Sequence, residues 1–431
     1  MVKTQEEKRP QAGDLVEVDL VKNSYTGTFL EAPKEEGGII LLKLNSGYNI
    51  GLNKKDILGI KILKKAEEKE AKIEMKKSHE RPNVAMIITG GTIASRYNPK
   101  TGGVHPLTKP EELFRYYPQL FEKVNIMKVE TPFMKWSENM DFKDWQKIAK
   151  TAEKLLNDEN IKGVIITHGT DFLHYTSAAL SFFLRNLGKP VVLTYSQRST
   201  DRASSDASLN LECAALTAIS DIAEVVLVGH ASENDDYCYV LRGTKVRKMH
   251  TSKRDAFRPI NSRPLARVDE KTFHKLEDYR QRSKGKTRTD TKFDEKVALV
   301  KFYPGQDPSI LDYYLKNKYR GIVIEFAGIG QVATTGSRKP WISKLREVQK
   351  KGIIICAASQ TIFGRLDPYV YSAGREILNT GVIYLEDMLA ETALVKLGWV
   401  LGHREWAKDK EQVKKMMLTN IAGELNDRLE E

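Results

Sequence analysis

Val84-Ala85-Met86-Ile87-Ile88-Thr89-Gly90-Gly91-Thr92 is an apolar run that breaks at a glycine pair and ends in a hydroxyl. Such a run, bounded by a turn signal, is typical of a central strand in a parallel sheet that is buried on both faces. Ligands in open α/β sheets bind beyond the carboxyl ends of such strands. Position alone therefore makes Thr92 a candidate for the functional site.

A second apolar strand, predicted over 162–167, ends in nearly the same residue types. Its turn is Thr167-His168-Gly169-Thr170-Asp171, which we compare with Thr89-Gly90-Gly91-Thr92. If both strands belong to one parallel sheet, their ends lie at the same edge, and two hydroxyls and one carboxylate meet there. The glycine before each threonine permits a tight turn and lets backbone N–H groups face a substrate oxygen. The pair of turns favours attack by a threonine hydroxyl on an amide or ester carbonyl.

Such an attack needs a base that removes the proton of the hydroxyl. His168 and His174 are six residues apart, which is wrong for one helical face, and each is more often structural than catalytic. A lysine could serve, because burial beside other cations lowers its pKa. The segment 242–267 offers nine Lys and Arg residues against one acid, Asp255. Composition does not select one lysine, and a solvated or RNA-facing loop is the alternative interpretation.

The glycine turn has a second interpretation, as a nucleotide-binding loop. However, Gly90-Gly91-Thr92-Ile93-Ala94 does not have the spacing G-x-G-x-x-G, and no Walker lysine follows it. A dinucleotide or phosphate site is therefore disfavoured.

Composition limits the class of protein. At 431 residues, two or three domains are expected, and the formal net charge of +12 favours a polyanionic partner without identifying one. No window approaches the roughly 18 apolar residues of a membrane span, and the N-terminus lacks the apolar segment of a signal peptide. We therefore expect a soluble, cytoplasmic protein without membrane contact. Cys213, Cys238 and Cys356 are too scattered for a disulfide framework or a zinc site, so no metal is expected.

The hydrophobic pattern predicts an α/β protein with two parallel-sheet domains behind a small N-terminal β-barrel. It divides the chain into five segments: a barrel over 1–63, a charged linker over 64–82, an α/β domain with the candidate residues over 83–282, a polar linker over 283–296, and a second α/β domain with a helical tail over 297–431. Within the tail, helices are expected over 387–401 and 411–429.

Taken together, the two turns resemble the two signature motifs of the bacterial-type L-asparaginase and glutaminase family. The resemblance covers about residues 83 to 427 and implies an asparaginase-like two-domain core. Further similarity is found in Ser137-Glu138-Asn139-Met140, Arg247-Lys248-Met249-His250, Tyr303-Pro304-Gly305 and Asn420-Ile421-Ala422-Gly423-Glu424-Leu425.

The resemblance implies a role for each matching position. Thr92 would be the nucleophile, forming an acyl-enzyme with the side-chain amide carbon of the substrate. Thr170 and Lys248 would together relay a proton. Asp171 would bind the α-ammonium group of the substrate and support that relay. The choice of Lys248 thus comes from the resemblance and not from composition.

Two more positions match substrate contacts of the family, and two differ from its pattern. Ser137 and Glu138 match the positions that bind the substrate's carboxylate and amino group. Phe172 stands where the family commonly has threonine, which leaves the catalytic residues intact but alters the pocket. In the loop after the first turn, the family has a lid tyrosine. This chain has Tyr97 early in that loop and Gly102-Gly103-Val104 later, so the lid tyrosine is not assigned.

An asparaginase alone needs no N-terminal barrel. A barrel, a charged linker and a basic core together resemble the glutaminase subunits of archaeal glutamyl-tRNA(Gln) amidotransferases. This resemblance implies that the chain hydrolyses L-glutamine and supplies ammonia to an E subunit, which converts Glu-tRNA(Gln) to Gln-tRNA(Gln) with ATP and Mg²⁺. It also implies no cofactor in this chain, tRNA(Gln) bound mainly by the partner, and a homodimer within a heterotetramer.

Two alternative functions are considered. A free-standing L-asparaginase or glutaminase would perform the same chemistry without a partner, and strong partner-free turnover of glutamine would favour it. A non-catalytic RNA-binding protein on an asparaginase scaffold would tolerate Thr92→Ala and Lys248→Ala, but not charge reversal at Arg254 and Arg258. Four chemically suitable side chains in matching motifs favour the enzyme.

Overall fold

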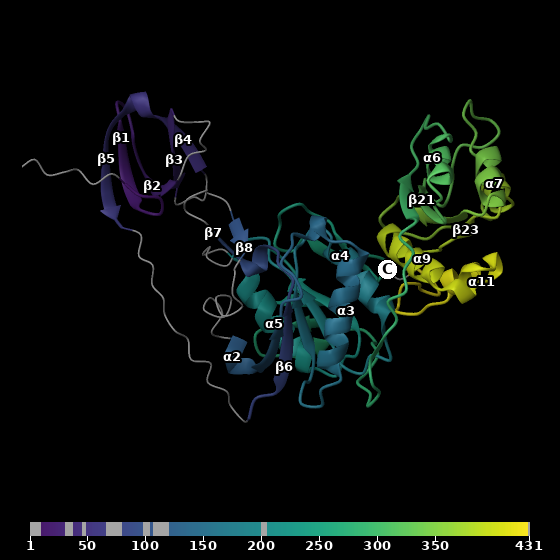
Figure 1. Ribbon diagram of the computed structural model, residues 1–431, viewed down its shortest axis with the longest axis horizontal. Helices are drawn as coiled ribbons and strands as arrows, with labels where there is room; N and C mark the ends of the chain where they lie inside the picture. Colours follow the sequence, from purple (N-terminus) through teal and green to yellow (C-terminus); the bar gives the residue numbers. More distant parts are fainter. Residues whose placement is uncertain are drawn as a thin grey trace, which may run out of the picture.

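The computed structural model describes residues 10–30, 38–44, 49–65, 80–97, 104–106, 120–199 and 205–429 (Figure 1). Most of the predicted linker at 64–82 lies outside the described residues, as do Gly102 and Gly103 of the loop considered for the lid tyrosine. The three larger sheets have five, eight and four strands, and they follow one another along the chain.

The N-terminal unit is a five-stranded antiparallel sheet with the strand order β4-β3-β2-β1-β5. Its strands are β1 (Leu15–Leu20), β2 (Ser24–Leu30), β3 (Ile39–Leu44), β4 (Asn49–Asn53) and β5 (Ile57–Lys64). Alternate residues such as Val16 and Val18 are fully buried, and they pack with Leu42 in a small core. Among the pairings of the described residues, none joins β4 to β5, the contact that would close a barrel.

The eight-stranded sheet has the order β18-β17-β14-β13-β12-β10-β6-β9. Neighbours from β9 to β13 are parallel, and the strands beyond β13 are antiparallel. The strands are β6 (Asn83–Ile88), β9 (Asn125–Glu130), β10 (Val164–Thr167), β12 (Val191–Thr194), β13 (Val225–His230), β14 (Cys238–Arg242), β17 (Ala266–Val268) and β18 (Phe273–Lys275). The predicted parallel α/β sheet is therefore confirmed, with an antiparallel extension that the sequence analysis did not predict.

Helices cover both faces of this sheet, as Figure 1 shows. Ala85 and Ile87 of β6 face the core shared with α3 (Phe142–Leu156) and α4 (Leu173–Phe183). Val84 and Met86 face the opposite core, which includes α2 (Leu120–Lys123) and α5 (Ala207–Ile219). Burial on both faces explains why β6 is continuously apolar rather than alternating.

The C-terminal unit is a four-stranded parallel sheet with the order β20-β21-β22-β23. Its strands are β20 (Val297–Lys301), β21 (Gly321–Phe326), β22 (Ile354–Ser359) and β23 (Ile383–Tyr384). Its helices are α6 (Ile310–Lys316), α7 (Ile342–Lys350), α8 (Ser372–Leu378), α9 (Ala390–Gly402), α10 (Arg404–Ala407) and α11 (Lys410–Leu418).

The end of the chain differs from the expected helix over 411–429. Helix α11 stops at Leu418, and residues 419–429 form no helix. The reason is that Glu424 turns inward, where its carboxylate contacts Lys396 Nζ at 2.5 Å with both side chains fully buried. Gly423, at φ 76°, supplies the left-handed backbone for that turn.

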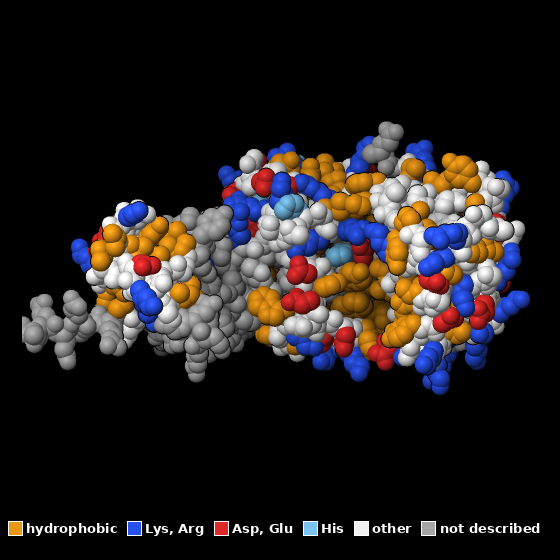
Figure 2. Space-filling view, turned by 90° about the horizontal axis from the view of Figure 1, so that it is seen from above, with side chains coloured by type: hydrophobic (Ala, Val, Ile, Leu, Met, Phe, Trp, Pro, Cys, Tyr) orange, Lys and Arg blue, Asp and Glu red, His pale blue; other side chains and the backbone are white. Residues whose placement is uncertain are grey.

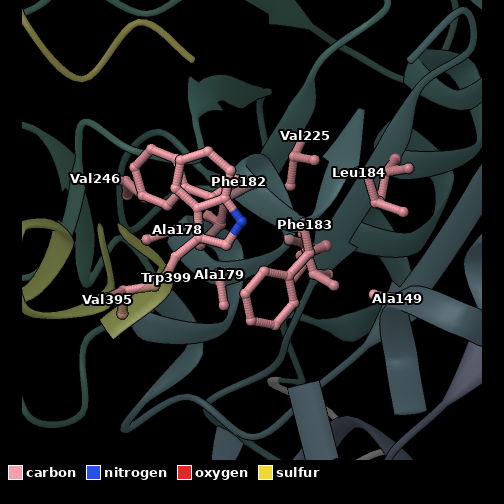
Figure 3. Close-up of a cluster of buried hydrophobic side chains, with 14 of the residues drawn as sticks. Ala149, Ala178, Ala179, Phe182, Phe183, Leu184, Val225, Val246, Val395 and Trp399 are labelled. Atoms are coloured by element: carbon pink, nitrogen blue, oxygen red, sulfur yellow. The ribbon is translucent and has the colours of Figure 1, made fainter. Parts of the chain in front are cut away.

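The two α/β units are joined by a continuous apolar core. Figure 3 shows Phe182 and Phe183 of α4 beside Trp399 and Val395 of α9, with Val246 next to them. The rings of Phe182 and Trp399 stack with their centroids 5.9 Å apart. Helix α9 also packs against β20 and β21, so it lies between the two sheets. The units are therefore fixed to each other through α4 and α9.

The predicted linker over 283–296 is packed against both α/β units. Its strand β19 (Arg288–Thr289) pairs antiparallel with β11 (Leu184–Arg185). Trp399 Nε1 donates to the carbonyl of Asp290 at 3.1 Å. Polar groups of this segment thus bind neighbouring elements, so the segment is fixed to the fold along part of its length.

Surface charge is mixed. Figure 2 shows Lys and Arg side chains spread over this face of the molecule, with Asp and Glu among them. Within the described residues, no helix is both long and apolar enough to cross a membrane. In the same residues, His, Cys, Asp and Glu form no group of three that could hold a metal ion.

Candidate active site

The two strand-end turns leave the sheet at the same edge. Strands β6 and β10 are parallel neighbours, with Ile88 opposite Thr167. Thr89 Oγ1 donates to the carbonyl of Thr167 at 2.8 Å, and Thr89 N donates to the same carbonyl at 3.2 Å. The start of the first turn is therefore fixed to the end of the second strand.

Glycine is required where the two turns meet. Gly90 and Gly91 have φ values of 117° and 82°, which L-residues with a side chain rarely adopt. A Cβ atom on Gly91 would lie 2.4 Å from the Cα of Gly169, so the two turns touch through their backbones. Thr92 follows at the start of the short helix η3 (Thr92–Ala94), and it is only partly buried. Thr92 thus follows directly after the glycine that touches the second turn.

Lys248 reaches the second turn from a different element. It ends β15 (Val246–Lys248), which pairs antiparallel with β16 (Phe257–Pro259). Its Nζ donates to Thr170 Oγ1 at 2.8 Å and to Asp171 Oδ1 at 2.6 Å. The Lys248 side chain is 10% exposed, whereas that of Asp171 is 60% exposed. A lysine bonded to a hydroxyl and held by a carboxylate can pass a proton through that hydroxyl.

Ser137 and Glu138 lie differently with respect to this cluster. Ser137, which is buried, starts the short helix η4 (Ser137–Asn139), and its Oγ accepts from the backbone N–H of Phe172 at 3.3 Å. A Cβ atom on Gly169 would lie 3.1 Å from Ser137 Cβ. Glu138 is exposed at the same surface. The structure thus brings Ser137 against the second turn, with Glu138 next to it in the chain.

The histidine in the second turn has a structural environment. His168 is fully buried, its Nδ1 donates to the carbonyl of Gly169 at 2.7 Å, and its Nε2 lies 2.9 Å from Thr176 Oγ1. Burial lowers the pKa of His168 to about 4. Burial, with Arg247 and Lys248 nearby, lowers the pKa of His174 to about 3. Both rings are neutral at pH 7, and His168 stabilises the turn that carries Thr170.

The basic stretch over 242–267 is mostly paired with carboxylates. Besides Lys248, seven of its nine cations contact an acid: Arg242 with Glu224, Lys245 with Asp387, Arg247 with Glu391, Lys253 with Glu233, Arg254 with Asp235, Arg258 with Asp255, and Arg263 with Glu277. Two of these carboxylates, Asp387 and Glu391, belong to the C-terminal unit. The start of the stretch is therefore an interdomain contact, and the pairing favours neither a solvated loop nor an RNA-facing one.

Sequence reasoning did not single out Arg247 or Glu391. Arg247 Nε lies 3.0 Å from Glu391 Oε1 immediately beside Lys248. The available signal was the alternation of residues along a strand, which places Arg247 on the opposite face from Lys248. No sequence pattern identified Glu391, because it lies 144 residues further along the chain in another unit.

All three family matches fall on the units described above. Residues 83–280 match the family described as asparaginase, N-terminal, and residues 296–417 match the glutaminase/asparaginase C-terminal domain. Residues 11–63 match the GatD N-terminal domain, so the small five-stranded unit has a family of its own.

Relatives cover almost the whole chain. The D subunit of the glutamyl-tRNA(Gln) amidotransferase of Pyrococcus furiosus is 46% identical over 97% of this chain and 96% of its own length. The corresponding D subunit of Thermococcus kodakarensis is 48% identical over 96% of this chain and 94% of its own length.

Solved structures resemble the two α/β units. The L-asparaginase of Thermococcus kodakarensis matches with a TM-score of 0.71 and 29% identity, covering 80% of this chain and 100% of that one. L-asparaginase I of Vibrio cholerae matches with a TM-score of 0.68 and 26% identity, covering 80% of this chain and 99% of that one. The predicted asparaginase-like core is therefore confirmed.

Proposed function

The chain belongs to the family of glutamyl-tRNA(Gln) amidotransferase D subunits, and from this premise we propose that it is the glutaminase subunit of such an enzyme. It hydrolyses L-glutamine and supplies the ammonia to an E subunit, which converts Glu-tRNA(Gln) to Gln-tRNA(Gln). Identity of 46–48% over nearly the full length of the named relatives supports this proposal over a free-standing L-asparaginase.

The observation that carries the proposed chemistry is the position of Lys248 Nζ between Thr170 Oγ1 and Asp171 Oδ1, in the turn that touches Gly91 through Gly169. In this proposal Thr92 Oγ1 attacks the side-chain amide carbon of glutamine, and its proton passes through Thr170 to Lys248, which takes part in the reaction as the free amine. The relay returns a proton to the leaving nitrogen, so that ammonia departs. Water then hydrolyses the acyl-enzyme and releases glutamate.

We assign substrate contacts to three further groups in the same proposal. Asp171, which is largely exposed, binds the α-ammonium group of glutamine while it supports Lys248. Ser137 binds the α-carboxylate, and Glu138 binds the amino group. The close packing of Ser137 against Gly169 supports a substrate that lies along the second turn.

The partner assignments belong to the same proposal. No cofactor is assigned to this chain, because ATP and Mg²⁺ are used by the partner subunit. The tRNA(Gln) is bound mainly by that partner, and this chain forms a homodimer within a heterotetramer. The mixed surface charge, in which cations are interleaved with acids, supports leaving most of the tRNA contact to the partner (Figure 2).

One experiment tests the subunit assignment and the nucleophile together. The purified chain is assayed for glutamine hydrolysis alone, and again with the E subunit, ATP and Glu-tRNA(Gln). Turnover is expected to depend on the partner, and strong turnover without it would instead establish a free-standing glutaminase. In the assembled enzyme, Thr92→Val is expected to abolish glutamine-dependent amidation and to spare amidation from added ammonium. Loss of both reactions would show that Thr92 is structural.

A further inference from the structure

The strand that carries Lys248 is bound on its other side by the C-terminal unit. Lys245 Nζ contacts Asp387 Oδ2 at 2.5 Å, and Arg247 Nε contacts Glu391 Oε1 at 3.0 Å. Val246, on the other face of the strand, packs in the apolar core drawn in Figure 3, to which α9 of the C-terminal unit also contributes. Because residues alternate along a strand, Lys248 also points away from Arg247 and toward Thr170.

Hydrogen bonds from threonine side chains to backbone carbonyls extend this attachment to Thr244. Thr392 Oγ1 donates to the carbonyl of Thr244 at 2.9 Å, and Thr244 Oγ1 donates to the carbonyl of Ala422 at 2.9 Å. Thr392 and Glu391 both lie in the first turn of α9. Three residues within 244–247 are therefore held by the C-terminal unit, and the next residue is Lys248.

In the pair of Arg247 and Glu391, the hydrogen-bonding capacity of the carboxylate is only partly used. The Glu391 side chain is 8% exposed, and its Oε2 has no hydrogen-bond partner among the described residues. A buried carboxylate is costly unless a cation and donors compensate it. Arg247 is the cation paired with it, so the position of the Arg247 guanidinium is strongly constrained by Glu391.

Other ionisable groups face this pair from neighbouring elements. Burial raises the pKa of Tyr175 on α4, and Glu391 raises it further. Burial also raises the pKa of Glu325 on β21, against the opposing effects of Lys301 and Arg247. Arg247 thus contacts Glu391 directly, and its charge also acts on Glu325 and Tyr175.

We propose that Glu391 is a positioning residue for the glutaminase reaction. By holding Arg247, it fixes the direction of β15 and thereby the placement of Lys248 between Thr170 and Asp171. The C-terminal unit, which contributes none of the proposed reacting groups, then sets the geometry of the proton relay. This inference rests on the proposed function, because it gives Lys248 the role assigned above.

The consequence for rate follows from geometry. Displacement of a reacting group by about 1 Å can cost about 100-fold in rate. Arg247 precedes Lys248 in the chain and pairs with Glu391, and neither residue is among the proposed substrate contacts, so their loss lowers kcat and leaves the KM for glutamine unchanged. A purely structural contact would instead lower the amount of folded enzyme.

The test is a double-mutant cycle in the assembled amidotransferase, measured as glutamine-dependent amidation. Glu391→Gln and Arg247→Gln are each expected to lower kcat by about 10-fold or more with little change in KM. The double variant is expected to be no slower than the slower single variant, because both changes remove the same contact. Arg247→Lys, which keeps the charge but not the geometry, should fall between the wild type and Arg247→Gln.

Asp294→Asn is the matched control. Asp294 pairs with Arg320 at 2.6 Å, next to the start of β21, whereas Glu325 lies near the end of that strand. This variant should retain kcat within about twofold, because the Asp294–Arg320 pair joins the segment over 283–296 to the start of β21 and not to β15. Amidation from added ammonium reports the folded, assembled enzyme in every variant and should be unchanged.

The results separate this inference from the proposed function. If Lys248→Met retains full glutaminase activity, the proposed relay itself is wrong. If Lys248→Met is inactive while Glu391→Gln keeps wild-type kcat, only the positioning role is overturned. Additive effects of Glu391→Gln and Arg247→Gln would also overturn it, because the two residues would then act independently.

Discussion

Gly91 and Gly169 touch backbone to backbone, so closely that a Cβ atom on Gly91 would lie 2.4 Å from the Cα of Gly169. The first residue follows β6 and the second follows β10, and each is followed directly in the chain by one of the two threonines, Thr92 and Thr170. The site is therefore built where two turns meet, and its geometry depends on the absence of two side chains.

Gly91→Ala should remove most glutaminase activity. The new methyl group would collide with backbone atoms that cannot move independently of the sheet, and φ of 82° would be strained by about 1–2 kcal/mol. Because Thr92 is the next residue, the shift should displace the proposed nucleophile and lower kcat by about 100-fold. Steady-state kinetics of the assembled enzyme would measure this change.

Gly352→Ala tests the effect of backbone strain without the steric collision that is expected in Gly91→Ala. Gly352 has φ of 94°, but a Cβ atom there would meet nothing within 4 Å. It should lower the free energy of unfolding by about 1–2 kcal/mol and leave kcat unchanged. Equal kinetic losses in both variants would mean that strain, and not contact between the two turns, explains the effect at Gly91.

Lys248→Met should abolish the proton relay while preserving the fold. Methionine fills a similar volume, and Thr170 and Asp171 would lose the ammonium group that contacts both of them at 2.8 and 2.6 Å. We expect kcat for glutamine hydrolysis to fall by at least about 100-fold, as is typical when a positioned acid–base group is removed. Rapid-quench measurement of ammonia release would show whether acyl-enzyme formation is the step that is lost.

Lys128→Met provides the comparison for that variant. Lys128 pairs with Asp158 at 2.7 Å, and the Lys128 side chain is 47% exposed. The substitution removes a lysine–aspartate contact of similar length from a part of the fold outside the proposed site. It should change neither kcat nor KM by more than about twofold.

The strand-end turns could be predicted because their signals are local. An apolar run followed by glycine and threonine occurs twice, and parallel strands bring such ends to one edge. Lys248 could not be selected in the same way, because it lies 78 residues from Thr170 along the chain. The segment around Lys248 contains several Lys and Arg residues, and composition gives no reason to choose one of them. Only the contacts that each makes in the folded protein distinguish them.

The tail shows how tertiary contacts override a local pattern, and the second linker forms contacts that a local pattern does not reveal. The residues after Leu418 have enough apolar positions for a helix, but burial of Glu424 beside Lys396 requires a turn there instead. The segment over 283–296 is polar without period, which predicts a linker. In the structure, the Asp290 carboxylate lies 2.8 Å from His403 Nε2. A polar side chain of this segment therefore contacts the C-terminal unit.

Lys396→Met should destabilise the protein strongly. Lys396 Nζ contacts Glu424 at 2.5 Å and donates to the carbonyls of Met417 and Thr419, at 2.9 and 2.6 Å. Removing the cation leaves a carboxylate fully buried without its charge partner, which costs about 3–5 kcal/mol. Unfolding in guanidinium chloride would measure the loss.

Two companion variants show whether burial is the cause. Lys292→Met removes a pair with Glu405 at 3.0 Å in which both side chains are 54% exposed, so it should cost no more than about 1 kcal/mol. Adding Glu424→Leu to Lys396→Met should recover part of the lost free energy of unfolding, because no buried charge remains. A double variant less stable than Lys396→Met would contradict this explanation.

The fully buried His168 should make the free energy of unfolding depend on pH below neutrality. Burial lowers its pKa from 6.5 to about 4, so the unfolded chain binds a proton before the folded protein does. The stability contributed by the neutral ring is complete above pH 6.5 and is lost as the pH falls toward about 4. Between pH 7.5 and pH 5 this single group should account for about 2 kcal/mol.

Replacing His168 tests the origin of that pH dependence. His168→Gln should lower the free energy of unfolding at pH 7.5, because Gly169 and Thr176 lose well-placed hydrogen bonds. Its difference from the wild type should then shrink by about 2 kcal/mol at pH 5, since glutamine takes up no proton. His274 is exposed, so His274→Gln serves as the surface control for this comparison. A constant difference for His168→Gln between the two pH values would mean that the His168 ring takes up its proton at the same pH in the folded and the unfolded protein.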